Sequence, residues 1–196
     1  MGDNQHSLAT YVSDMLAVER HIQTPFQTQR NDGDFSEYAE ARALLGRLCD
    51  TTQRHIDELK QCLDDLGGHE ASPIKSAVLR IEGFFAGAID KVRKTKVSKG
   101  LRDDYTALAL CTAGYTMLAA TANAMGESQV ATLAQRLLRD YAQCVMEVGN
   151  ALPGVVVKEL EDTGLAVDRG SIEQSRRFTQ EAWKPQDASM ADTVRP

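Results

Sequence analysis

The chain has 196 residues, of which 42% are hydrophobic and 26% are charged, and its formal net charge is -6. This size and composition are typical of one globular domain. An acidic protein lacks the basic face that neutralises phosphates, which excludes a general nucleic-acid binder. No apolar stretch approaches the roughly 20 residues of a membrane span, and the N-terminus lacks the layout of a signal peptide, so we expect a cytoplasmic protein.

Helix-forming residues dominate the sequence and predict an all-α fold. Ala, Leu, Glu, Gln and Arg are abundant, there are only 5 prolines, and alternating Val, Ile and Thr runs are rare. The 4 cysteines are scattered, with none in a CxxC pair. We therefore expect buried, reduced thiols and no structural zinc site.

The first half of the chain predicts a hairpin of two long helices. The first helix covers residues 7–29, where Pro25 is expected to kink or stop its last turn. Turn-forming residues follow at 31–34, and the second helix covers residues 36–66. Gly67 and Gly68 then end this helix, because glycine tolerates left-handed backbone geometry.

The second half predicts another hairpin, reached through a long crossover. The crossover contains a short helix at residues 73–94. Two long helices follow at residues 101–125 and 128–151, and Pro153 predicts a kink or break. Two antiparallel hairpins joined in this way form a ferritin-like four-helix bundle.

The C-terminal part predicts an extension of the bundle. We expect the bundle to occupy residues 7–165, a helical extension 166–183 and a disordered tail 184–196. Trp183 is expected to anchor the extension by burying its large apolar surface.

Two apolar stripes near the start each contain one polar residue that can bind a metal. Glu19 interrupts the stripe of the first helix, and His55 interrupts that of the second. A charge inside a bundle requires a partner. A glutamate and a histidine that face one another are the first half of a ferritin-type di-metal centre.

The two segments that carry these residues resemble a known family. Tyr11-Val12-Ser13-Asp14-Met15-Leu16-Ala17-Val18-Glu19-Arg20 is similar to the opening helix of the YciF-type branch of ferritin-like bacterial proteins, and Thr52-Gln53-Arg54-His55-Ile56-Asp57-Glu58-Leu59 is similar to its second helix. The similarity covers about residues 8 to 150. It implies a ferritin-like fold and a link to bacterial stress responses, with no defined biochemical activity.

The rest of a di-iron ligand set is degenerate. Such a site needs a Glu from each of two helices and an ExxH pair from each of the others. Thr52 stands three residues before His55, and Cys111 occupies an expected carboxylate position. Asp140 and Gln143 stand where the other ExxH pair belongs. Only Glu19, His55 and Asp140 remain as candidate metal ligands, for iron or another divalent ion, and no cofactor is preferred.

The register of the first hairpin decides whether Glu19 meets His55. The midpoint between them is residue 37, whereas the turn signal centres near residue 33. A purely helical hairpin would offset the two by on the order of 10 Å, at about 1.5 Å per residue. An irregular loop at residues 33–37 would reduce the offset. Without metal, Glu19 would form a buried polar network with His55, Tyr115 or Tyr141.

Three function classes stay open at this stage. The preferred one is a non-catalytic bundle that acts in stress tolerance through assembly or partner binding, with Leu44 and Leu138 as outward apolar residues of a homodimer. The second is an iron-handling protein or oxidase that uses Glu19 and His55. The third is a small-molecule binder in the vacated core. The residues that would line this cavity are Glu19, Thr52, His55, Cys111, Tyr115, Tyr141 and Gln143.

Overall fold

The computed structural model describes residues 3–68 and 96–184. The helices of these residues are α1 (Asp3–Arg30), α2 (Gly33–Ser36), α3 (Ala39–Asp65), α5 (Lys96–Ala124), α6 (Ser128–Asp162) and α7 (Ser171–Ala182). No strand occurs in these two ranges, which confirms the all-α prediction. The expected crossover helix at 73–94 lies outside the described residues, as does nearly all of the expected tail.

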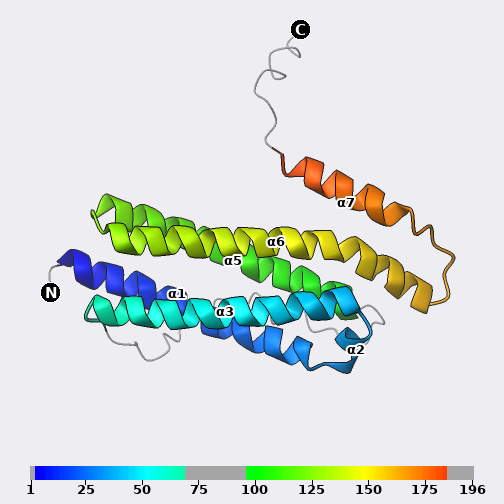
Figure 1. The fold of residues 1–196 in the computed structure, drawn as a ribbon, viewed down its shortest axis with the longest axis horizontal. Helices are drawn as coiled ribbons and strands as arrows, with labels where there is room; N and C mark the ends of the chain where they lie inside the picture. Colours follow the sequence, from blue (N-terminus) through cyan, green and yellow to red (C-terminus); the bar gives the residue numbers. More distant parts are fainter. Residues whose placement is uncertain (1–2, 69–95, 185–196) are drawn as a thin grey trace, which may run out of the picture.

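Four long helices form the bundle (Figure 1). α1 pairs with α3 and α5 pairs with α6, and the two hairpins then pack together through α1 against α5 and α3 against α6. Gly67 and Gly126 have positive φ angles of 66° and 77°, so each supplies the left-handed turn that ends a long helix. The arrangement confirms the predicted four-helix bundle with a C-terminal helical extension.

The first hairpin has a different turn from the one expected. The second long helix begins at Ala39, not near residue 36, because the short helix α2 comes first. Asp32 caps α2 by accepting a hydrogen bond from the Asp34 amide at 2.9 Å. The chain finally reverses at Glu37 and Tyr38, which coincides with the midpoint between Glu19 and His55 and removes the expected offset.

Neither internal proline ends its helix. α1 continues past Pro25 to Arg30, and α6 continues past Pro153 to Asp162. The break considered at Pro153 is therefore wrong, although α6 changes direction in its C-terminal part (Figure 1). A proline inside a helix removes one backbone hydrogen bond, and the packing of a long helix against its neighbours can offset that loss.

Two predictions about surface residues are wrong. Trp183 does not anchor the C-terminal extension, because it is 58% exposed and α7 has no buried residue. Leu44 is only 1% exposed, so it does not belong to an outward apolar face, and Leu138 is half-buried against the core. The core does contain the cysteines as expected: Cys49, Cys111 and Cys144 are buried, Cys62 is half-buried, and all four are free thiols.

Candidate functional site: a buried polar network

The centre of the bundle contains a polar network to which all four long helices contribute. Its buried members are Glu19 of α1, Thr52 and His55 of α3, Tyr115 of α5 and Tyr141 of α6, each 0% exposed. Every one of them occupies an inward position on its helix, so the apolar periodicity that builds the bundle also brings these polar groups together.

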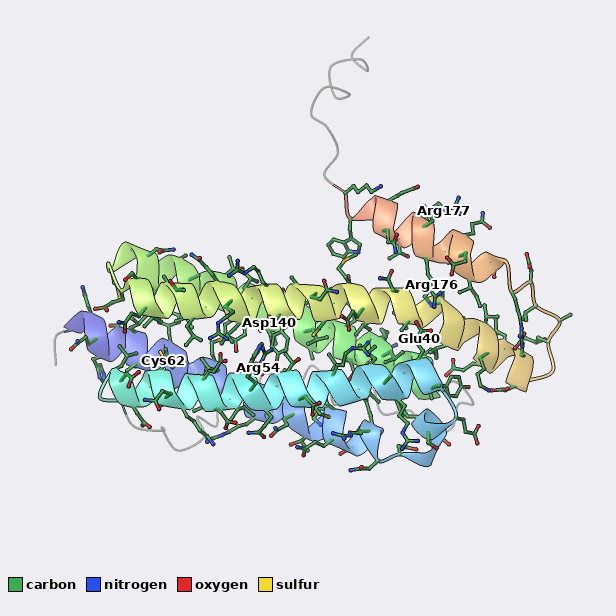
Figure 2. All side chains as sticks on the ribbon, viewed as in Figure 1. Glu40, Arg54, Cys62, Asp140, Arg176 and Arg177 are labelled. Carbon is green, nitrogen blue, oxygen red and sulfur yellow. The ribbon has the colours of Figure 1, made fainter. Side chains whose placement is uncertain are left out.

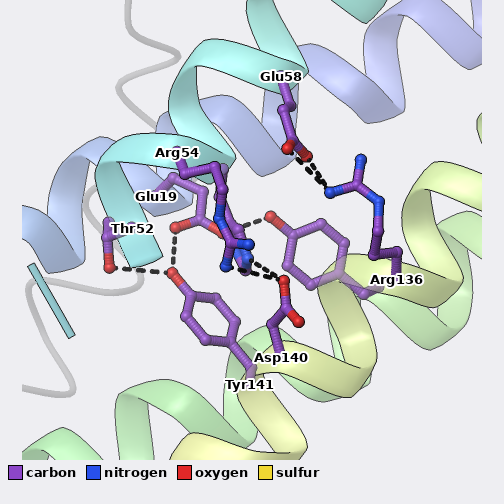
Figure 3. A network of polar contacts seen from close by, with 9 residues as sticks. Glu19, Thr52, Arg54, Glu58, Arg136, Asp140 and Tyr141 are labelled. Carbon is purple, nitrogen blue, oxygen red and sulfur yellow. Dashed lines mark hydrogen bonds and ion pairs between the residues drawn. The ribbon is translucent and has the colours of Figure 1, made fainter. Parts of the chain in front are cut away.

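Glu19 is the hub of this network (Figure 3). Its Oε1 accepts a hydrogen bond from the Tyr115 hydroxyl and lies 3.2 Å from Nδ1 of His55. Its Oε2 accepts a hydrogen bond from the Tyr141 hydroxyl, which in turn lies 3.1 Å from the hydroxyl of Thr52. Both carboxyl oxygens therefore have side-chain partners within the chain, as a buried carboxyl group requires.

His55 connects the buried centre to the surface. Its Nε2 lies 3.2 Å from Oδ2 of Asp140, and Nη2 of Arg54 donates to the same oxygen at 3.0 Å. The side chain of Asp140 is 28% exposed and that of Arg54 is 50% exposed. The chain of contacts thus runs from the interior of α1 to the solvent-facing side of α3 and α6 (Figure 3).

The aromatic rings fill the space around the imidazole. The ring of Tyr141 lies 4.5 Å from that of His55, and the ring of Tyr115 lies 5.9 Å from it in an edge-on arrangement. The two tyrosine rings are 6.0 Å apart. These distances are those of packed aromatic side chains. The predicted cavity-lining residues Thr52, Tyr115 and Tyr141 are thus members of a packed network.

Burial and negative charge keep the tyrosine hydroxyls and the cysteine thiol of this region protonated. Burial, followed by the charge of Glu19, raises the pKa of Tyr115 and Tyr141 well above its usual range. The same two causes raise the pKa of Cys111, which lies one turn before Tyr115 on α5. The tyrosines are therefore hydrogen-bond donors, and Cys111 is a thiol and not a thiolate ligand.

The candidate residues do not all converge. Glu19, His55 and Asp140 form a row, with the two carboxyl groups bound to different nitrogens on opposite edges of one ring. Gln143 is exposed and donates to Glu147 at 3.2 Å, so it lies outside the network. The pairing of Arg54 with Asp140 was not predicted, because an arginine on the outer face of a helix has no sequence signal for its partner.

This donor set does not fit a ferritin-type di-metal centre. A single ion binds one nitrogen of a given imidazole, so Glu19, His55 and Asp140 could share an ion only after their side chains rearranged. Thr52 and Cys111 supply no further carboxylates. Within 3–68 and 96–184, no group of three or more His, Cys, Asp and Glu side chains is placed to hold a metal. The assignment of these three residues as metal ligands stays a prediction.

A second buried polar pair lies near the end of the bundle and was not predicted from the sequence. Asp104 of α5 is 2% exposed, and its Oδ1 accepts a hydrogen bond from Nε2 of Gln29 at 2.9 Å. Oδ2 of Asp104 and Oε1 of Gln29 are buried without a partner among the described residues. Burial is the main cause that raises the pKa of Asp104 to about 8.

Comparisons with known proteins agree with this architecture. The sequence profile of a domain of unknown function, DUF892, matches residues 4–161. The crystal structure of protein XCC3681 from Xanthomonas campestris pv. campestris has a TM-score of 0.66 and 20% sequence identity, and the match covers 84% of this chain and 100% of that one. At this identity the likeness concerns the fold alone. None of the curated proteins matches the chain significantly.

Proposed function

We propose that this chain, which belongs to the YciF-like DUF892 family of ferritin-like helical proteins, is a non-catalytic bundle. In this proposal it acts in bacterial stress response by assembling with a second copy of itself. In this proposal the network around Glu19 stands in place of a metal centre and fixes how the helices pack. The link to stress rests on the resemblance of residues 11–20 of α1 and 52–59 of α3 to YciF-type proteins.

The observation that carries the non-catalytic part is the saturation of Glu19. Both of its oxygens accept hydrogen bonds from tyrosines of the same chain, and His55 adds a third contact. A di-iron oxidase requires carboxylates that bridge two ions, and the other helices present Thr52 and Cys111 instead. A fully satisfied polar network specifies one packing of the four helices.

The core does not favour a small molecule either. Tyr115 and Tyr141 are fully buried and pack on His55, so the space that absent metals would leave is filled by aromatic rings. A core ligand would have to displace hydroxyl groups that are bound to Glu19. Binding functions are therefore expected at the surface of the bundle.

An apolar face of α5 supports self-assembly. Leu110 and Met117 are 46% and 58% exposed, and they lie seven residues apart on the same side of the helix. The exposed Ala113 lies between them and leaves room for a second helix. A homodimer with two-fold symmetry brings one patch against its own copy, which suits a single self-complementary face of this kind.

Light scattering of the purified protein tests the assembly. We expect a dimer for the unchanged chain and a monomer for the double variant Leu110→Lys, Met117→Lys, because two charges on each copy would repel within the interface. Leu165→Lys is the matched control, since Leu165 is 57% exposed on a different segment. A monomeric unchanged chain at high concentration would refute the assembly, and a double variant that is still a dimer would refute the α5 face as its interface.

A further inference from the structure

A groove separates α7 from the bundle. It has a volume of about 760 Å³ and is lined by α5, α6 and α7. Its floor is apolar, with Leu152, Val156 and Leu160 of α6 and the ring of Tyr105 of α5. Binding sites for small molecules have this size and are mostly apolar with a few polar groups.

The wall that α7 contributes does not match this floor. Ser171, Ser175 and Thr179 of α7 line the groove with hydroxyl groups, and no residue of α7 is buried. Val156 is consequently 41% exposed, which is unusual for an apolar residue covered by another helix. Apolar surface left open beneath a helix favours an occupant that covers it.

Polar contacts hold α7 in place above the groove. Arg176 donates from Nε to the Asn150 carbonyl oxygen at 2.8 Å and forms an ion pair with Glu40 at 3.0 Å (Figure 2). Gln180 donates to the side chain of Asn150 at 3.1 Å. These contacts fix the position of α7 through its polar side chains and leave the apolar floor open.

The charges of the groove are asymmetric. Lys99 and Arg102 line it from the start of α5, and the antiparallel pairing of α5 with α6 brings this region beside Leu160. Lys99 has no ion-pair partner among the described residues, whereas Arg102 pairs with Asp103 at 2.7 Å. At the same end, Glu159 is buried and accepts a hydrogen bond from the Ser98 amide at 2.9 Å. Both charged residues among the described residues that line the groove, Lys99 and Arg102, are therefore cationic.

We propose that this groove binds a fatty acid, with its alkyl chain along the floor and its carboxylate beside Lys99 and Arg102. The floor extends along α6 from Gly149 to Leu160, which is about 16 Å at the helical rise of about 1.5 Å per residue. This length suits a medium or long alkyl chain. The occupant thus satisfies both the apolar floor and the cationic end.

Calorimetric titration of the lipid-extracted protein with dodecanoate, below its micelle concentration, tests this site. We expect one dodecanoate per chain and weaker binding of dodecanol, which lacks the negative charge. Val156→Asp should weaken dodecanoate binding at least about tenfold, because it places an unpaired charge against the alkyl chain. Lys99→Glu should weaken dodecanoate binding and leave dodecanol binding unchanged. Tyr11→Asp is the control, since Tyr11 is 39% exposed on α1, outside the groove.

Three results would overturn the proposal. The first is the absence of saturable dodecanoate binding by the folded, unchanged chain. The second is equal affinity in the unchanged chain and in a Val156→Asp variant with an unaltered melting temperature. The third is a Val156→Asp variant that changes the molecular mass in solution but not the affinity for dodecanoate. That result would make the groove an interface between two copies of the chain.

Discussion

Glu19 has more hydrogen-bond partners than any other buried acidic residue described in this protein. If Glu19 is replaced by an apolar residue, the Tyr115 hydroxyl loses its hydrogen-bond partner, whereas Tyr141 keeps Thr52 and His55 keeps Asp140. A buried polar group without a partner costs roughly 1–3 kcal/mol. The loss of stability caused by a substitution therefore depends mainly on how many hydrogen-bond donors are left buried without a partner.

We predict that Glu19→Leu lowers the free energy of unfolding by about 2–4 kcal/mol, because the Tyr115 hydroxyl is left without a partner and Tyr141 and His55 each lose one contact. Tyr141→Phe removes one hydroxyl and should cost about 1–2 kcal/mol. Tyr11→Phe is the matched control and should change little, because Tyr11 is 39% exposed. Urea unfolding measures all three. Losses below about 1 kcal/mol for both network variants would contradict the role of Glu19.

The pair of Asp104 and Gln29 should make stability depend on pH. A protonated Asp104 can donate from Oδ2 to Oε1 of Gln29, which satisfies both unpartnered oxygens while Nε2 donates to Oδ1. The raised pKa of about 8 agrees with this acid–amide pair, since burial disfavours the carboxylate.

The direction of the pH effect follows from the raised pKa. Between the ordinary value of 3.8 and about 8, the folded chain binds the proton and the unfolded chain does not. The contribution of Asp104 to stability is thus complete below about pH 4 and is lost as the pH rises through about 8. Asp104→Asn keeps the shape and cannot titrate. We expect the difference in the free energy of unfolding between the two proteins, measured by urea unfolding, to change across this pH window. A difference that is constant with pH would contradict the protonated pair of Asp104 and Gln29.

At the scale of single elements, helix type and order were predictable and helix ends were less so. The 3.6-residue apolar stripes of α1, α3, α5 and α6 predicted four long helices, because burial of one face specifies both the period and the partner. The break considered at Pro153 does not occur, since the sequence shows the lost hydrogen bond but not the packing that offsets it. The predicted burial of Trp183 was wrong, because a single aromatic residue does not specify the surface against which it packs.

Helix α7 should be the least stable helix of the described residues. It buries no residue and contacts α6 through Arg176 and Gln180, so opening it exposes little apolar surface. We predict that backbone amides of α7 exchange with deuterium far faster than those of α6.

A substitution gives this prediction a control. Arg176→Ala removes the contacts with Asn150 of α6 and Glu40 of α3, so it should accelerate exchange in α7 without changing α1 or α5. Equal protection of α7 and α6 in the unchanged chain would show that α7 docks more firmly than its contacts indicate.

At the scale of the whole molecule, the sequence predicted the fold more completely than the site. The contact between Glu19 and His55 was expected from two interrupted stripes, and it is present because α2 shifts the chain reversal to Glu37 and Tyr38. The partnership of Asp104 with Gln29 was missed, since residues 75 positions apart leave no local pattern.

Among the described residues, none of the helices combines the length and the apolar composition of a membrane span.

Metal content is the most direct test of the claim that a self-satisfied network occupies the position of a metal centre. Mass spectrometry should be applied to protein from iron-supplemented cells, purified without chelator, alongside the double variant Glu19→Ala, His55→Ala. We expect negligible iron and other divalent metal in both proteins, because the carboxyl oxygens of Glu19 and Nδ1 of His55 already contact side chains of the same chain. About two irons per chain, lost in the double variant, would contradict the claim and identify a di-iron protein.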